Sequence, residues 1–172
     1  MTLPLALLPF QGMDEHAMTV LAEQLGQKGF ACTLLQSIAV PAEAYDRMRD
    51  QYRVQALLEA TRQAAAGRVL GVTEVDLYAE GLNFVFGMAE SPGRAAVVSV
   101  ARLRFEADEA VFAARMLKEA VHELGHALGL AHCRHSKCVM YFSNTLADTD
   151  HKGADFCGGC RARLAALRLD LG

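Results

Sequence analysis

The chain lacks an excess of positive charge, because 17 lysines and arginines face 20 acidic residues and the net charge over 172 residues is −3. Proteins that bind nucleic acid or anionic membranes usually carry a basic patch that meets the phosphates. We therefore expect neither partner, and the cysteine pairs in the chain are poor candidates for a DNA-binding finger. The chain also lacks an apolar run approaching the roughly 20 residues of a membrane-spanning helix.

The sequence also contains no internal repeats, linkers or low-complexity stretches. Met1–Phe10 is apolar, but it has no cationic start and contains Pro4 and Pro9, so we expect a strand there and no signal peptide. With 52% hydrophobic and 22% charged residues, the sequence predicts a single domain with enough material for a sizeable core. We expect a cytoplasmic monomer in a reducing compartment.

What the chain does contain is a dense group of metal-binding side chains. His122, His126 and His132 follow the pattern H-E-x-x-H-x-x-G-x-x-H, with Glu123 and Gly129 at the other defined positions. Residues four apart share one helix face, so two of the imidazoles can hold one Zn²⁺, whereas Glu123 is turned about 100° away, toward metal-bound water. A glycine can end the helix in a left-handed conformation and return His132 to the metal. This set predicts metal-assisted hydrolysis, although a bare H-E-x-x-H also occurs by chance.

Four cysteines follow this pattern in two pairs. Cys133 and Cys138 are spaced C-x4-C, and Cys157 and Cys160 are spaced C-x2-C. Four thiolates bind Zn²⁺ tetrahedrally, and a reducing compartment favours zinc over the alternative of two disulfides. Unrelated buried thiols are the other alternative. Cys32 stands alone in an apolar run, where we expect a small buried hydrophobic residue.

The run from His122 to Cys133, with C-V-M at 138–140 and C-G-G-C at 157–160, resembles the archaemetzincins, which are metzincin-clan metallopeptidases. The resemblance implies roles for nine residues: catalytic zinc ligands at His122, His126 and His132, a general base at Glu123, the methionine of the Met-turn at Met140, and structural zinc ligands at Cys133, Cys138, Cys157 and Cys160. Some metzincins carry a tyrosine ligand two residues after that methionine. Phe142 stands there in this chain, so no such ligand is expected.

Alternating strand and helix patterns predict an α/β fold. We expect strands at Leu3–Leu8, Phe30–Val40, Arg68–Val72, Leu82–Ala89 and Ala95–Phe105, and helices at Asp14–Gln27, Glu43–Ala66, Asp108–Leu130 and from Arg161 onward. The resemblance implies a zincin/metzincin-like fold with a twisted mixed β-sheet of about five strands, an active-site helix and a small zinc-stabilised C-terminal subdomain. We expect one metallopeptidase domain over residues 1–172, with an upper subdomain at 1–132 and a lower one at 133–172 that holds the Met-turn and the four-cysteine zinc site.

The predicted function is a zinc-dependent peptidase, either a metalloendopeptidase or an aminopeptidase-like enzyme, that holds two Zn²⁺ per chain and acts on a peptide or protein. By analogy to the clan, we expect the substrate to lie extended against the strand around Asn83–Glu90, although this segment is equally well explained as an ordinary edge strand. We expect the helix near Leu124 and the loop Val139–Asn144 to wall the pocket for the residue after the scissile bond. Two alternatives stay open: a zinc-binding protein with little catalysis, and a zinc hydrolase of a non-peptide amide or ester.

Overall fold

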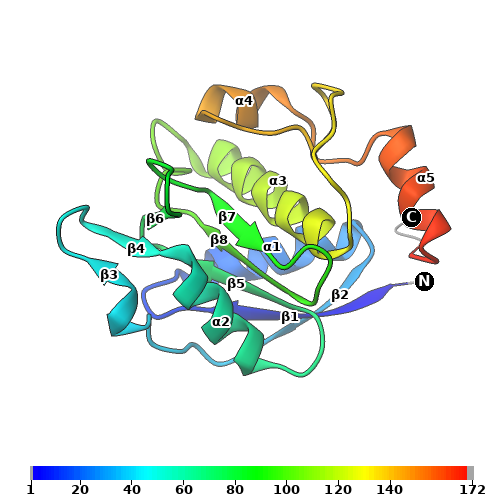
Figure 1. Cartoon of the computed structure of the whole chain (residues 1–172). Helices are drawn as coiled ribbons and strands as arrows, with labels where there is room; N and C mark the ends of the chain where they lie inside the picture. The colour runs from blue at the N-terminus through cyan, green and yellow to red at the C-terminus, as the bar shows by residue number, and fades with distance from the viewer. Residues whose placement is uncertain (1, 170–172) are drawn as a thin grey trace.

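A five-stranded mixed β-sheet forms the centre of the computed structural model, which describes residues 2–169 (Figure 1). Four strands run parallel, and β7 at one edge runs antiparallel to its only neighbour, β8. In the order β2-β1-β5-β8-β7, their bounds are Phe30–Leu34, Leu3–Pro9, Val69–Thr73, Ala95–Ser99 and Gly87–Ala89. This confirms the predicted mixed α/β fold, and within residues 2–169 no strand pairs with the outer edge of β7.

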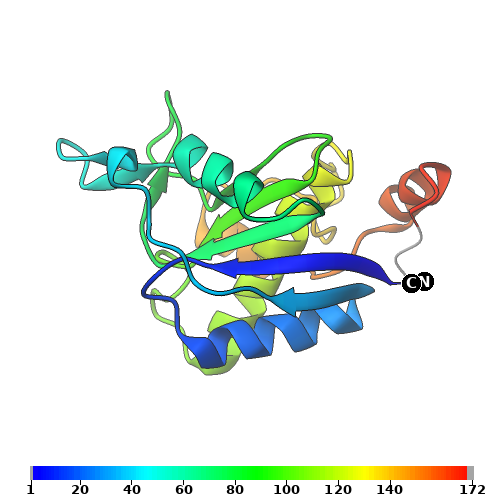
Figure 2. The ribbon, with the colours of Figure 1, turned by 90° about the horizontal axis from the view of Figure 1, so that it is seen from below.

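Helices cover both faces of this sheet. α1 (Glu15–Gln27) and α3 (Glu109–Ala127) pack on one face, and α2 (Val54–Ala64) packs on the other (Figure 2). Successive strand side chains point to opposite faces, so Ala96 and Val98 of β8 join the core beside α1 and α3. Their neighbours on the same strand join a second core beside α2. Both faces of β8 are therefore buried, and this packing holds β8, the strand with which β7 pairs, in place.

Smaller elements surround this framework. A second sheet contains β3 (Tyr45–Asp46), β4 (Gln51–Arg53) and β6 (Leu77–Tyr78), preceded by the short helix η1 (Ala42–Ala44). After α3 the chain forms α4 (Leu146–His151) and α5 (Gly158–Ala166), joined by irregular segments. In Figure 1 this part of the chain runs along the side of α3 that faces away from α2. Between residues 2 and 169, no helix combines the length and apolar character that crossing a bilayer requires.

The predicted helix at Glu43–Ala66 is wrong in its first half, because the helix begins at Val54. A turn precedes it instead. The Oδ1 atom of Asp46 accepts a hydrogen bond of 2.9 Å from the backbone N–H of Met48, and Asp50 has a φ of 52°. Aspartate side chains that bond to nearby backbone N–H groups favour turns over helices, and this one separates β3 from β4.

Three predicted strands are shorter than expected: β2 ends at Leu34, β7 begins at Gly87 and β8 ends at Ser99. Beyond β8, the Ser99 hydroxyl donates to the carbonyl of Val75 and accepts from the N–H of Ala101, which turns the chain. Before β7, the N–H of Val85 donates to the carbonyl of Leu77 in the second sheet, whereas the carbonyl of Phe86 still accepts from the N–H of Ser99 in β8. α4 was not predicted, α5 begins before Arg161, and Cys32 is half-buried against the core.

Candidate metal centres

Helix α3 presents the first two histidines of the motif. It begins after Asp108, whose carboxylate accepts a hydrogen bond of 2.8 Å from the N–H of Val111. It ends before Gly129, which has a φ of +97° in the left-handed region that glycine adopts without strain. The chain therefore turns where the sequence predicted. His122 and His126 lie one turn apart near the end of this helix.

The three imidazoles converge on one point. The Nε2 atoms of His122 and His126 lie 3.2 Å apart, and a nitrogen of His132 completes a set in which all ligand atoms lie within 4.8 Å of one another. Two nitrogens at tetrahedral positions about 2.0–2.1 Å from a zinc ion would be about 3.3 Å apart. The spacing thus fits a shared metal better than a hydrogen bond between two rings, and the donor set suits zinc.

Backbone carbonyls fix the orientation of two of these rings. The Nδ1 atom of His122 donates to the carbonyl of Val139, and that of His126 donates to the carbonyl of Leu130, each at 2.8 Å. With the proton on Nδ1, Nε2 keeps its lone pair for a metal. Burial lowers the pKa of His122 to about 2, aided by the charge of Lys152. Burial likewise lowers the pKa values of the other two histidines, so all three favour the neutral form that binds metal.

Glu123 lies beside the imidazoles, beneath strand β7. Its side chain closely approaches Gly87, where an added Cβ would lie 2.7 Å from the Cγ atom of Glu123 and 2.5 Å from the carbonyl oxygen of Val97. The glycine therefore lets the strand pass directly over the carboxylate. Burial, together with a smaller effect of the Glu119 carboxylate, raises the pKa of Glu123 to about 8. A cation beside Glu123 would instead favour its ionised form.

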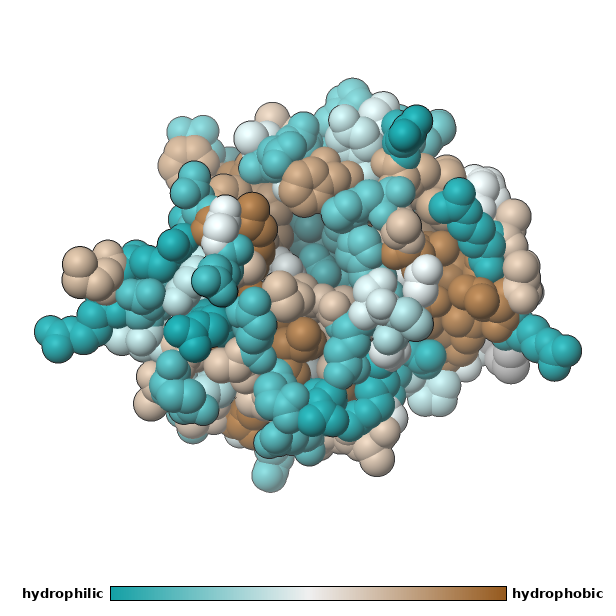
Figure 3. Space-filling view, in the orientation of Figure 1, coloured by the Kyte–Doolittle hydropathy of each residue, from teal (hydrophilic) through white to brown (hydrophobic). Residues whose placement is uncertain are grey.

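These side chains open into a cleft of about 690 Å³. Its wall on one side is β7 with the residues before it, and its opposite wall includes Phe142, Ser143 and Asn144. His122, Glu123 and His126 line it, and Figure 3 shows the hollow on this face of the molecule. Phe142 is 47% exposed, and its ring lies 4.9 Å from that of His132 between centroids, so it covers the imidazole without offering a ligand atom.

Met140 packs against the active-site helix. It is fully buried against Gly125 of α3, where an added Cβ would lie 2.3 Å from the methionine sulfur. Gly125 stands between the two histidines of the helix. The absence of a side chain there allows the segment after His132 to approach the helix closely.

The four cysteines of the C-x4-C and C-x2-C motifs form a second cluster of possible metal ligands. Within residues 2–169 no cysteine forms a disulfide. The sulfurs of Cys133 and Cys157 lie 3.7 Å apart, as do those of Cys138 and Cys160. A tetrahedral zinc site with sulfur at about 2.3 Å has edges of about 3.8 Å. The cluster thus fits zinc.

Backbone N–H groups near the cluster favour the thiolate form, whereas burial raises the pKa values of Cys138 and Cys160. The N–H of His135 donates to the sulfur of Cys133, and the N–H of Cys157 donates to the sulfur of Cys138. Cys157 also precedes α5, and the N–H of Cys160 holds its pKa near 6. The thiolate is the form that binds metal.

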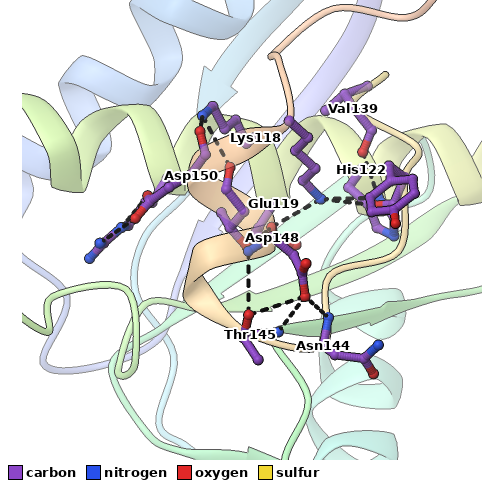
Figure 4. A network of polar contacts seen from close by, with 12 residues as sticks. Lys118, Glu119, His122, Val139, Asn144, Thr145, Asp148 and Asp150 are labelled. Carbon is purple, nitrogen blue, oxygen red and sulfur yellow. Dashed lines mark hydrogen bonds and ion pairs between the residues drawn. The ribbon is translucent and has the colours of Figure 1, made fainter. Parts of the chain in front are cut away.

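A buried ion pair behind the imidazoles was not predicted from the sequence. Lys152 is 1% exposed and its ammonium lies 3.1 Å from the Oε1 atom of Glu119, which is 2% exposed and also accepts from the hydroxyl of Thr149. The ammonium donates to the carbonyl of Tyr141 as well. The ammonium also lies 3.5 Å from the Nδ1 atom of His122. Because Nδ1 carries a proton that it donates to the carbonyl of Val139, it cannot accept a hydrogen bond from the ammonium, and this contact is electrostatic. The network therefore joins α3 to the chain after it (Figure 4).

A second unpredicted contact lies one helical turn earlier. Arg115 is 6% exposed, binds Asp150 through two hydrogen bonds of 2.7 and 2.8 Å, and donates to the carbonyls of Leu103 and Phe105. Arg115 and Glu119 share the core-facing side of α3 at a spacing of four. Charged residues at such positions are a sequence signal for buried pairs, and this signal could have marked Arg115 and Glu119, although it does not identify their partners.

Comparison with known proteins agrees with this geometry. A model of peptidase family M54 matches residues 19–166. The archaemetzincin of Methanopyrus kandleri is 50% identical over 123 residues, covering 70% of each chain, and that of Methanocaldococcus jannaschii is 39% identical over 169 residues, covering 95% of this chain and 94% of that one. The crystal structure of the Methanopyrus kandleri protein matches with a TM-score of 0.87 and 40% identity, covering 96% of this chain and 94% of that chain.

Proposed function

Because this chain belongs to peptidase family M54, together with the archaemetzincins that it matches, we propose that it is a zinc peptidase whose active site is the cleft between β7 and α3. The observation that supports this most strongly is the convergence of three neutral imidazoles beside a buried carboxylate, under an open strand edge. We assign His122, His126 and His132 as zinc ligands and Glu123 as the general base.

The proposed mechanism uses Glu123 to move a proton. A zinc ion held by the three imidazoles would lower the pKa of water toward neutrality and polarise a peptide carbonyl. Glu123 accepts the proton of the attacking water, and it passes that proton to the departing amine as the C–N bond breaks. Its position under Gly87 keeps the carboxylate next to any peptide that pairs with β7. No side-chain nucleophile is required.

The substrate is proposed to bind as an added strand. β7 ends the main sheet, so the backbone groups on its outer edge have no strand partner among residues 2–169. An extended peptide can pair with such an edge. All three residues of β7 line the cleft, so a peptide bound there lies over Glu123 and the imidazoles.

We further propose that the cysteine cluster holds a second, structural zinc ion. Its four ligands leave no open position, and it would hold the segment after α3 in place of a larger core. We also propose that the protein acts as a monomer in the cytoplasm, with neither nucleic acid nor membrane as a partner.

Cleavage of a peptide library by zinc-loaded protein tests the proposed function. Parent protein is expected to cleave, and Glu123→Ala is expected to keep its metal while losing at least about 100-fold in rate, since general-base assistance is worth about 10²–10⁴-fold. His126→Ala is expected to lose the catalytic metal as well. Exposed residues on α1 supply matched controls, Glu23→Ala and His16→Ala, which should behave like the parent.

The outcomes separate the alternatives. Full activity in Glu123→Ala would contradict the mechanism, and loss of metal in that variant would make Glu123 a ligand. A parent that binds zinc but cleaves no peptide would instead be a binding protein or a hydrolase of another amide or ester. Peptides with blocked ends distinguish an endopeptidase, which cleaves them, from an aminopeptidase-like enzyme, which does not.

A further inference from the structure

A second cavity, of about 570 Å³, adjoins the cleft. Aromatic and aliphatic side chains line it, among them Phe84, Phe86, Phe105 and Leu146. Phe84, Phe86 and Asn144 line the catalytic cleft as well, so the two spaces share part of their walls. Apolar pockets of about 300–1,000 Å³ with a few polar groups are typical binding sites for side chains and small ligands.

The wall of this cavity nearest the sheet is held in place. The rings of Phe84 and Phe86 meet edge to face, with centroids 5.1 Å apart. The guanidinium of Arg102 lies over the ring of Phe84, 4.1 Å from its centroid, and binds the carboxylate of Asp76 through two hydrogen bonds. Cation–π and aromatic contacts of this kind stabilise one arrangement of the rings.

The opposite wall is held by the start of α4. A capping box joins Thr145 and Asp148, in which each side chain accepts a hydrogen bond from the backbone of the other residue (Figure 4). The carboxylate of Asp148 also accepts from the N–H of Asn144. Leu146, between these residues, is thereby held against the cavity. Both walls are formed before any peptide binds, which reduces the ordering cost of binding.

The direction of a bound peptide follows from the proposed chemistry. Glu123 must reach the departing amine. The half of the substrate after the scissile bond therefore lies on the same side of the imidazoles as Glu123. His126 lies one turn further along α3, whereas Glu119 lines the cleft one turn before Glu123. Phe105, which lines the cavity, precedes the start of α3. The cavity therefore lies beyond Glu119, toward the N-terminal end of the helix. The cavity is therefore on the side of the departing amine.

We propose that this cavity receives a large apolar side chain from the three residues that follow the scissile bond. Phe84 precedes Gly87, the residue above Glu123, by three positions. Phe84 lines both the cleft and the cavity. An extended peptide advances about 3.3 Å per residue, so three residues laid along the cleft from the reaction centre extend about 10 Å toward Phe84. The inference rests on the proposed function and adds the class of substrate: peptides with Phe, Leu or Met shortly after the cleaved bond.

The test compares Phe105→Glu with the parent on a library that varies the three positions after the cleaved bond. Phe105 is 64% exposed and outside the catalytic machinery, so its replacement should leave the fold intact. Parent protein should favour large apolar residues at one of these positions. The variant should lose at least about tenfold in kcat/KM on those peptides, and should shift its preference toward Lys. Leu34→Glu, a change of equal charge at a 49% exposed site on the opposite edge strand, should keep the parent profile.

The results distinguish this inference from the proposed function. A parent that cleaves peptides with no preference at these three positions would overturn the cavity's role and leave the peptidase function intact. The same conclusion would follow if Phe105→Glu kept the parent profile, or if Leu34→Glu lost the preference equally. A parent that cleaves no peptide would overturn both.

Discussion

Replacing Lys152 by methionine removes one charge of the buried pair and leaves the other without a partner. Both side chains are almost fully buried, with 1% of Lys152 and 2% of Glu119 exposed. Removing one partner of a buried pair costs about 3–5 kcal/mol, because the remaining charge stays in a poorly solvated site. We therefore expect Lys152→Met to lower the free energy of unfolding by about this amount.

The double variant Lys152→Met/Glu119→Gln should recover most of that loss, since it leaves no buried charge unpaired. The glutamine keeps a carbonyl oxygen that can accept from the hydroxyl of Thr149, so this hydrogen bond survives. The carbonyl of Tyr141 loses a donor, and a residual loss of about 1 kcal/mol is expected from it.

Urea unfolding followed by circular dichroism, at one fixed and saturating zinc concentration, measures these free energies. Arg62→Met is the control, since it breaks an ion pair with Glu59 in which both side chains are more than 40% exposed, and it should unfold like the parent. The reasoning is refuted if the free energy of unfolding of Lys152→Met lies within about 1 kcal/mol of the parent value. It is also refuted if the double variant loses as much free energy of unfolding as Lys152→Met and Glu119→Gln lose in sum.

Three further predictions follow from other parts of the structure. Protein purified without chelator should contain two zinc equivalents, whereas Cys157→Ser should contain fewer and melt at a lower temperature; metal analysis showing equal content would contradict the proposed cluster. Gly125→Ala should lower stability by about 1–3 kcal/mol, since the new methyl would lie 2.3 Å from the sulfur of Met140, and an unchanged Tm would show that the contact relaxes freely. The third concerns Asp150, whose pKa the guanidinium of Arg115 holds below its ordinary value of 3.8. Its ionised form therefore adds stability that is present above about pH 4 and is lost as the pH falls through the lowered pKa. Asp150→Asn should be less stable than the parent at pH 7 and approach it in strong acid; a constant difference across this range would disprove the assignment.

The parts of the fold with strong local signals could be predicted from the sequence. The active-site helix was predicted over Asp108–Leu130; Asp108 is its N-cap, and the helix stops at Ala127, before Gly129, which was predicted to end it. The positions of His122, Glu123 and His126 follow from helix periodicity alone, and in the structure all three line the same cleft. The role of each in catalysis stays a prediction.

Other features depend on partners far away in the chain. The backbone before Gly87 looked like strand, but the carbonyls of Leu82 and Asn83 accept hydrogen bonds from Arg49 and Gln51, which hold them against the second sheet. Such contacts have no local sequence pattern. Lys152 stands among polar residues of the C-terminal part, and nothing near it in the sequence indicates that it is buried against α3.

His132 and Cys133 are adjacent in the chain, although they belong to different clusters of possible ligands. His122 and His126 are aligned by their helix, whereas His132 follows the turn, where the backbone N–H of Cys133 donates to the carbonyl of Met140. If both clusters bind metal as proposed, filling the cysteine site restricts the loop that carries the third histidine. The two binding events would then be cooperative: occupation of the thiolate site raises the affinity of the imidazole site, and by linkage the reverse also holds. The reaction centre would thus assemble together with a site that does no chemistry itself.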